Sequence, residues 1–146
     1  MFIDQLTNAD SVPALERMMQ FAARRQTLIQ HNIANISTSG FQPKDVSVDA
    51  FRAQLAGAVD ERRRRFGGMR GALDLKDTRQ VIASGAGSLR LEPTGTGRNI
   101  LFHDRNNRDA ERLMQDLVEN AGQFRVASDL LKSRMALLRS AISERV

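Results

Sequence analysis

The chain has 146 residues and a net charge of +5, from 22 basic and 17 acidic side chains. Apolar residues make up 41%, yet there is no tyrosine, tryptophan or cysteine, so any core consists mainly of aliphatic side chains and phenylalanine. The lack of cysteine excludes a disulfide framework, a thiolate zinc site and a cysteine nucleophile. The positive charge suits an anionic partner but does not identify one.

No targeting or membrane segment is evident in the sequence. Residues 1–7 lack the basic start, apolar run and cleavage site of a secretory signal peptide. No apolar stretch approaches the roughly 20 residues needed to cross a bilayer. We therefore expect a protein that does not span a membrane and that, if it leaves the cytoplasm, is exported by another route.

Residues 11–36 have the spacing of an amphipathic helix, within an N-terminal arm that we assign to 1–36. Apolar residues recur at steps of four and three, and only Gln26 interrupts the series. Ser11 is the expected N-cap, and a run of short polar residues closed by Gly40 follows the helix. The apolar series consists of Leu15, Met19, Ala22, Ile29, Ile33 and Ile36.

The composition changes in the middle of the chain. In residues 37–59, the alternation around Val46 predicts an extended segment that passes into a weak helix at 50–59. Residues 60–105 begin with a charge run and are rich in glycine, which predicts loops. A short hairpin is expected there, with strands at Ser88–Glu92 and Arg98–His103 joined by the turn residues 93–97.

Residues 106–146 form the predicted C-terminal arm. Its apolar series alternates steps of four and three over about four heptads, a period typical of coiled coils and long bundles. Asn106 or Asn107 is the expected cap, with Asp109 and Glu111 in the first turn. A helix this long cannot bury its apolar stripe on so small a body, so it needs other helices. The stripe consists of Ala110, Met114, Leu117, Ala121, Phe124, Ser128, Leu131, Met135, Leu138 and Ile142.

Catalytic and ligand-binding motifs are not evident. His31 and His103 are the only histidines, and their positions favour surface or packing roles. The glycine clusters lack the lysine and the strand-to-helix context of a phosphate loop. We expect no enzyme activity, no metal and no cofactor. The arginines suggest a basic patch for phosphates, but apart from Phe66 no aromatic residues interleave with them, so a solvated or partner-facing run is favoured. That patch would consist of Arg62, Arg63, Arg64, Arg65, Arg70, Arg79, Arg90 and Arg98.

The first helix ends in a short motif that a polar turn follows: Asn32, Ile33, Ala34 and Asn35, then Thr38 and Gly40. This stretch resembles the N-terminal signature of flagellar rod and hook proteins, in which Asn-Ile-Ala-Asn is followed by a Thr-Pro-Gly-Tyr turn. Phe41 stands where tyrosine is usual, and Ser39 where proline is usual. The loss of proline leaves the turn less pre-set, and phenylalanine keeps the ring but not the hydroxyl.

The other end of the chain is similar to the C-terminal helix of proximal-rod proteins of the FlgB type. The similar stretches are residues 106–111, 119–120, 124, 130–131 and 138–142. Sister rod proteins of the FlgC type carry a different pattern there. Together the two resemblances cover about half of the chain.

The resemblance implies a structural subunit of the proximal rod in the bacterial flagellar basal body, exported to the periplasm by the flagellar type III apparatus. Such a subunit assembles helically through its terminal helices, transmits torque and lines the export channel. Its implied neighbours are sister rod subunits, the rod-base adaptor FliE and the MS-ring, with no nucleic acid. Three alternatives stay open: an axial protein of the FlgC type, a coiled-coil adaptor outside the flagellum, and a basic nucleic-acid-binding module.

The expected fold is mainly α, with the two long helices antiparallel in a coiled-coil-like pair beside a small loop and β-rich middle segment. The turn residues from Asn32 to Phe41 are the expected assembly motif. The expected interface stripe consists of Leu15, Met19, Ile29, Ile33, Met114, Leu117, Phe124, Leu131, Met135, Leu138 and Ile142.

Overall fold

A computed structural model of the chain describes residues 11–68, 70–84, 87–95 and 109–143. Within them the fold is mainly helical, with long helices toward both ends, as predicted. The helices are α2 (Val12–Ala34), α3 (Val48–Phe66) and α4 (Ala110–Ser143). The strands are β1 (Lys44–Asp45), β2 (Val81–Ser84), β3 (Ser88–Leu91) and β4 (Thr94–Gly95).

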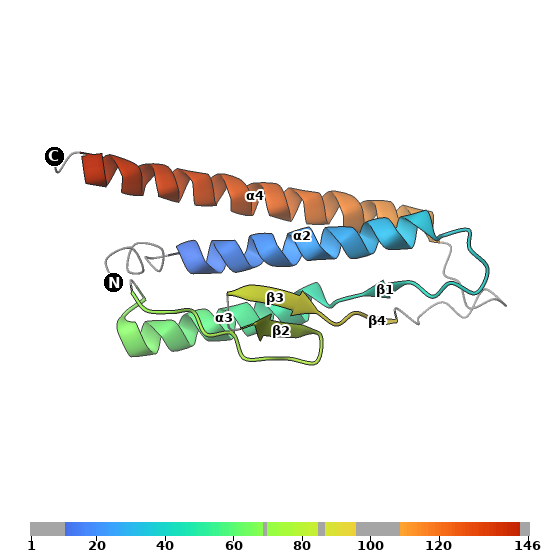
Figure 1. Ribbon diagram of the computed structural model, residues 1–146, viewed down its shortest axis with the longest axis horizontal. Helices are drawn as coiled ribbons and strands as arrows, with labels where there is room; N and C mark the ends of the chain where they lie inside the picture. The colour runs from blue at the N-terminus through green and yellow to red at the C-terminus, as the bar shows by residue number, and fades with distance from the viewer. Residues whose placement is uncertain (1–10, 69, 85–86, 96–108, 144–146) are drawn as a thin grey trace.

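The elements form three layers with α2 in the middle (Figure 1). Helix α4 packs along one side of α2 and runs in the opposite direction. Helix α3 and the strands lie on the other side of α2. The two end helices are therefore neighbours, and α2 is shared between two different packing environments.

Helix α2 starts and ends close to the predicted residues, but its cap differs from the prediction. Ser11 has helical backbone angles and makes no capping hydrogen bond through its side chain. Its carbonyl instead accepts the Leu15 N–H at 3.0 Å, so the backbone alone begins the helix. Pro13 lies in the first turn, where the helix has no use for its missing N–H.

Helix α3 continues through the arginine run to Phe66, so it is longer than the weak helix predicted at residues 50–59. The hydroxyl of Ser47 accepts the Ala50 N–H at 3.1 Å and caps its start. Gly67, with φ +68°, ends it in the left-handed conformation. Ion pairs three and four residues apart support the last turns, with Glu61 2.6 Å from both Arg64 and Arg65.

The strands form two small antiparallel sheets, and β3 has a partner that the sequence did not predict. Strand β3 pairs with β2, which precedes it in the chain. Thr94 and Gly95, expected in a turn, form β4 and pair with Asp45 and Lys44 of β1. The predicted second strand, Arg98–His103, lies outside the described residues.

The start of α4 is fixed by Asp109, which was predicted to lie inside the first turn. Its carboxylate accepts the Arg112 N–H at 3.0 Å, and its carbonyl accepts the Leu113 N–H at 3.2 Å. This is the geometry of an N-cap, and the carboxylate also suits the positive end of the helix dipole. The predicted caps Asn106 and Asn107 lie outside the described residues.

The apolar core lies between α2, α3 and the β2–β3 sheet. Its central contact joins Phe21 of α2 to Phe51 of α3, whose rings stack with centroids 3.9 Å apart and an interplanar angle of 1°. The buried core residues are Phe21, Val46, Phe51, Leu55, Ala58, Leu73, Val81 and Leu89. Two stacked aromatic rings thus pack α3 against α2, and aliphatic side chains from the strands complete the core.

Replacement of Phe51 by alanine should lower the free energy of unfolding by about 3 to 5 kcal/mol, because it removes a buried ring and leaves a cavity. Phe66→Ala is the matched control, since that ring is 53% exposed and the same substitution should cost far less. Urea unfolding followed by circular dichroism measures both. Equal losses in the two variants would contradict the assignment of the core.

Candidate assembly surfaces

The signature turn is held to the body by Asn32, whose side chain is buried. Its amide donates to the Lys44 carbonyl at 2.8 Å and accepts the Lys44 N–H at 3.2 Å. One amide side chain therefore satisfies both backbone groups of Lys44, as a neighbouring strand would. The extended segment that begins at β1 is fixed to the last turns of α2 in this way.

The rest of the turn is stabilised by its own backbone. Asn35 caps the C-terminus of α2, and its side chain donates to the His31 carbonyl at 2.9 Å. The Thr38 N–H donates to the Asn35 carbonyl at 2.9 Å, and Gly40 has φ +72°. The Phe41 ring packs against His31 with centroids 5.5 Å apart. The two asparagines of the signature thus have different tasks, one anchoring β1 and one ending the helix.

Substitution of Asn32 by alanine should destabilise the fold by about 1 to 2 kcal/mol, because two backbone groups of Lys44 lose their partner. Hydrogen exchange should show faster exchange of the Lys44 amide. Asn35→Ala is the matched control, because Asn35 is more exposed and its side chain donates to the His31 carbonyl of its own helix. Unchanged protection of Lys44 in Asn32→Ala would refute the anchor.

A buried arginine joins three segments of the chain. Arg25 of α2 is 4% exposed, and its Nε and Nη2 donate to the two carboxylate oxygens of Asp45 at 3.0 and 2.7 Å. Nη2 also donates to Asp116 of α4 at 3.0 Å. Burial by itself would lower the pKa of Arg25, but the hydrogen bonds and charges of Asp45 and Asp116 outweigh it and raise the pKa. The guanidinium therefore stays charged and holds β1 and α4 on α2.

A second polar contact fixes α4 one turn further along. Asn120 is fully buried, and its amide donates to the Ala22 carbonyl at 2.9 Å and to Gln26 Oε1 at 2.8 Å. Gln26 is the residue that interrupts the apolar series of the first helix, and its partner explains why a polar side chain is tolerated there. Sequence reasoning missed Arg25, Asp116 and Asn120 as a group because no local pattern connects them.

Arg25→Met should lower the free energy of unfolding by about 2 to 3 kcal/mol, because hydrogen bonds to two carboxylates are lost while the apolar stem is kept. Arg24→Met is the matched control, since Arg24 is the exposed neighbour on the same helix. Amides at the start of α4 should lose protection from hydrogen exchange in Arg25→Met alone. A similar loss of protection in both variants would show that it depends on the charge of α2 in general and not on the Arg25 contact.

The predicted stripe residues divide into covered and exposed groups. On α2, Leu15 and Ile29 are buried, and Met19 and Ile33 are half-buried. The half-buried residues on α4 are Leu117, Leu131, Met135 and Leu138, and the exposed ones are Met114, Phe124 and Ile142. The seam that α4 makes with α2 also includes Asn120 and Ala127, which are buried and lie one position away from the predicted series.

Helix α4 keeps many large apolar side chains exposed. Seven large apolar side chains on it are between 38% and 70% exposed: Met114, Val118, Phe124, Val126, Leu130, Leu137 and Ile142. They lie on both sides of the seam. Exposed apolar side chains gathered on one helix make it a candidate interaction surface.

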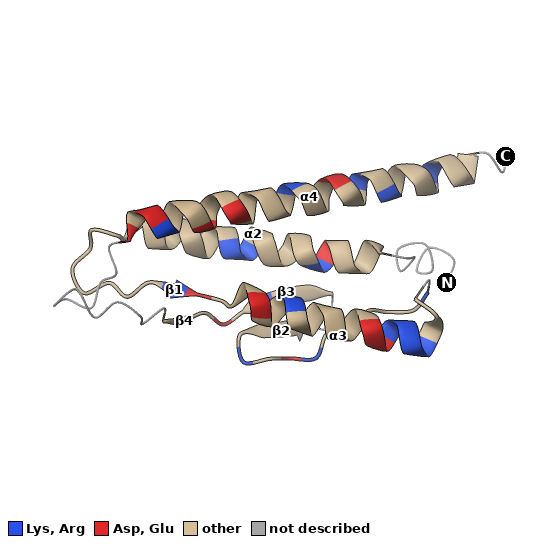
Figure 2. Ribbon diagram, turned by 180° about the vertical axis from the view of Figure 1, so that it is seen from behind, with Lys and Arg blue, Asp and Glu red and all other residues tan. Residues whose placement is uncertain are grey.

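The arginine run at the end of α3 is largely balanced by acidic neighbours. Figure 2 shows Lys and Arg gathered there, beside Asp and Glu of the preceding turn. Arg63 lies 3.7 Å from Asp60, and the hydrogen bond from Arg65 and the charge of Arg64 lower the pKa of Glu61. Arg62 is buried, and its Nε donates to the Gly71 carbonyl at 2.9 Å. The run thus stabilises a helix end and the loop after it.

No group of three or more metal-ligating side chains is present among the described residues. Likewise, none of the helices in the described part of the chain is long and apolar enough to cross a membrane. No protein-family model matches the chain, and a search of curated proteins finds no match.

Proposed function

We propose that the chain is a structural subunit of the bacterial flagellar basal body, in the proximal rod and of the FlgB type. It would be exported by the flagellar type III apparatus and assemble helically through α2 and α4, transmitting torque and lining the export channel. Sister rod subunits, the rod-base adaptor FliE and the MS-ring would be its neighbours. In this proposal the chain has no catalytic role.

The observation that carries the proposal is the exposed apolar surface of α4, next to a helix that ends in the Asn-Ile-Ala-Asn signature. Each Å² of apolar area that is removed from water contributes about 25 cal/mol to association. Covering several such side chains together therefore favours association strongly. The heptad spacing of the predicted stripe suits helices from neighbouring subunits. Asn32, the first residue of the signature, joins the end of α2 to Lys44 through two hydrogen bonds.

A coiled-coil adaptor outside the flagellum is the second candidate, because the exposed sides of α4 would serve it equally well. It differs from a rod subunit in what it assembles with and in where it is found. An axial protein of the FlgC type would share the helices and the turn, and would differ in its place along the rod.

Deletion of the gene should leave basal bodies without a complete rod and cells without motility, as seen by electron microscopy and swimming assays. Complementation with Leu131→Asp should fail, because a carboxylate would be placed in the apolar stripe without a partner. Ser140→Asp is the matched control, since Ser140 is an exposed polar residue on the same helix and should restore swimming.

Intact rods and normal motility after deletion would overturn the flagellar assignment. Copurification with a non-flagellar helical protein in the same cells would then favour the adaptor. Rescue by Leu131→Asp would instead refute the stripe while leaving the flagellar assignment in place.

A further inference from the structure

The buried contact of Asn120 leaves one of its own atoms without a hydrogen bond. Its amide nitrogen donates to the Ala22 carbonyl and to Gln26 Oε1, but its Oδ1 is buried and has no partner among the described residues. A buried acceptor without a partner is unfavourable. Packing alone would not favour asparagine at this place, whereas a choice between two alternative pairings of the helices would.

The apolar series of α4 does not by itself determine where the helix lies along α2. Seven residues make about two turns, so a movement of α4 by one heptad, about 10 Å along its axis, returns the same side of the helix to α2. The two fully buried residues in the described part of α4, Asn120 and Ala127, are themselves seven positions apart. After such a movement each residue occupies the place of another one seven positions away, and the side chains that then fail to match decide the register.

A movement of α4 in one direction is excluded by charge. If each residue took the place of the residue seven positions before it, Arg134 would occupy the place of Ala127, which is 0% exposed. Gln123 would replace Asp116 beside Arg25, so the guanidinium would lose one of its two carboxylates. Burial of a long charged side chain in a place that holds alanine strongly disfavours this register.

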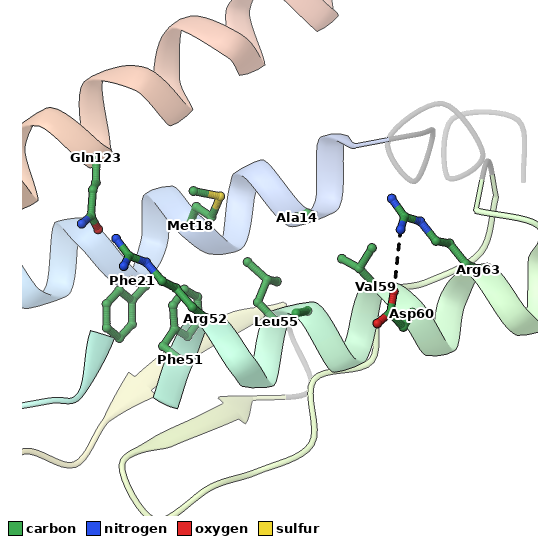
Figure 3. A pocket seen from close by; sticks show the side chains of 11 residues that line it. Ala14, Met18, Phe21, Phe51, Arg52, Leu55, Val59, Asp60, Arg63 and Gln123 are labelled. Carbon is green, nitrogen blue, oxygen red and sulfur yellow. Dashed lines mark ion pairs between the residues drawn. The ribbon is translucent and has the colours of Figure 1, made fainter. Parts of the chain in front are cut away.

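The opposite movement keeps the charges matched. If each residue took the place of the residue seven positions after it, Asp109 would replace Asp116 beside Arg25. Asp109 and Asp116 line the same small cavity at the start of α4. Asp116 would move to the place of Gln123, which lines an open groove together with Arg52 (Figure 3), and its carboxylate would stay in contact with water there. The Arg25 contact therefore does not distinguish this second register from the observed one.

Asn120 is the residue that distinguishes the two registers. In the second register Leu113 would lie beside the Ala22 carbonyl and Gln26 and would offer them no donor. Asn120 itself would enter the fully buried place of Ala127, which holds a side chain of a single carbon. Both changes leave polar groups buried without their present partners, so both disfavour the second register.

We propose that Asn120 selects the register of α4 on α2 by excluding a second register one heptad away, in which Asp109 replaces Asp116 beside Arg25. In the second register α4 would extend about 10 Å further beyond the start of α2 (Figure 1). The exposed apolar side chains of α4 would move with it, so Asn120 also determines where the chain presents them. The inference concerns the isolated chain and does not rest on the proposed function.

Spin labels on two cysteines measure the register, because the chain has no cysteine of its own. Labels at Arg24→Cys and Arg139→Cys occupy exposed positions on α2 and α4, and the second register lengthens the distance between them by about 10 Å. In this labelled full-length chain, Asn120→Ala should raise the population at the longer distance at least about tenfold, because alanine fits the place of Ala127. Gln123→Ala is the matched control: it removes a half-buried amide from the same helix and should keep the parent distance.

Two double variants test the residues that make the second register possible. Leu113→Asn with Asn120→Ala moves the asparagine by one heptad, so the longer distance should become the main one. Asp109→Asn with Asn120→Ala keeps a helix cap but removes the carboxylate that would pair with Arg25, so the longer distance should return toward the parent level. Circular dichroism and thermal unfolding check that each variant is folded. The first double variant restores the polar contact in the second register, so the test does not depend on Asn120→Ala alone.

A parent distance in the variant that moves the asparagine would overturn the inference. A broad distribution of distances would also overturn it, because it would indicate that α4 leaves α2 instead of moving along it. So would a longer distance that persists with Asp109→Asn, since the movement would then be unrelated to Arg25. A longer distance that follows the asparagine and disappears with Asp109→Asn would establish the selection of register. Gene deletion tests the proposed function separately, so either inference can fail while the other holds.

Discussion

The contact between Arg25 and the carboxylates of Asp45 and Asp116 is the interaction on which the arrangement of the chain depends. It joins the start of the extended segment and the start of the last helix to one side chain of α2. A buried arginine paired with two half-buried carboxylates contributes little net stability compared with apolar packing, but it tolerates few other geometries. We infer that its main effect is to fix the position of α4 along α2, together with Asn120.

Helix α2 thus packs against two different parts of the structure. Toward α3 and the strands it presents Phe21 to a core that is closed by a stacked ring pair. Toward α4 it presents aliphatic residues interrupted by Arg25 and Gln26, both of which have specific polar partners. The first side makes a stable body, and the second side determines where α4 lies, which in turn determines which of its apolar residues stay exposed.

The end helices could be predicted because their apolar residues recur every three to four positions, a signal contained in the local sequence. The pairing of β3 with β2 could not be predicted, because Val81–Ser84 lacks alternation and the glycines on both sides of β3 allowed a turn on either side. The role of Arg25 was equally hidden. Its partners lie 20 and 91 residues away in the sequence. From the sequence alone, an arginine on a helix is expected to be a solvated charge, and only the folded structure places the carboxylates beside it.

The paired hydrogen bonds of Asn32 also restrict which residues can replace it. Aspartate has nearly the same shape as asparagine, but when ionised it offers no donor to the Lys44 carbonyl and places a charge beside it. Glutamine has the right groups and is longer by one methylene. Position 32 is therefore limited by chemistry and not by volume, while the exposed Ala34 is free of this limit. A relative that carries another residue at position 32 needs a different way to hold its first strand.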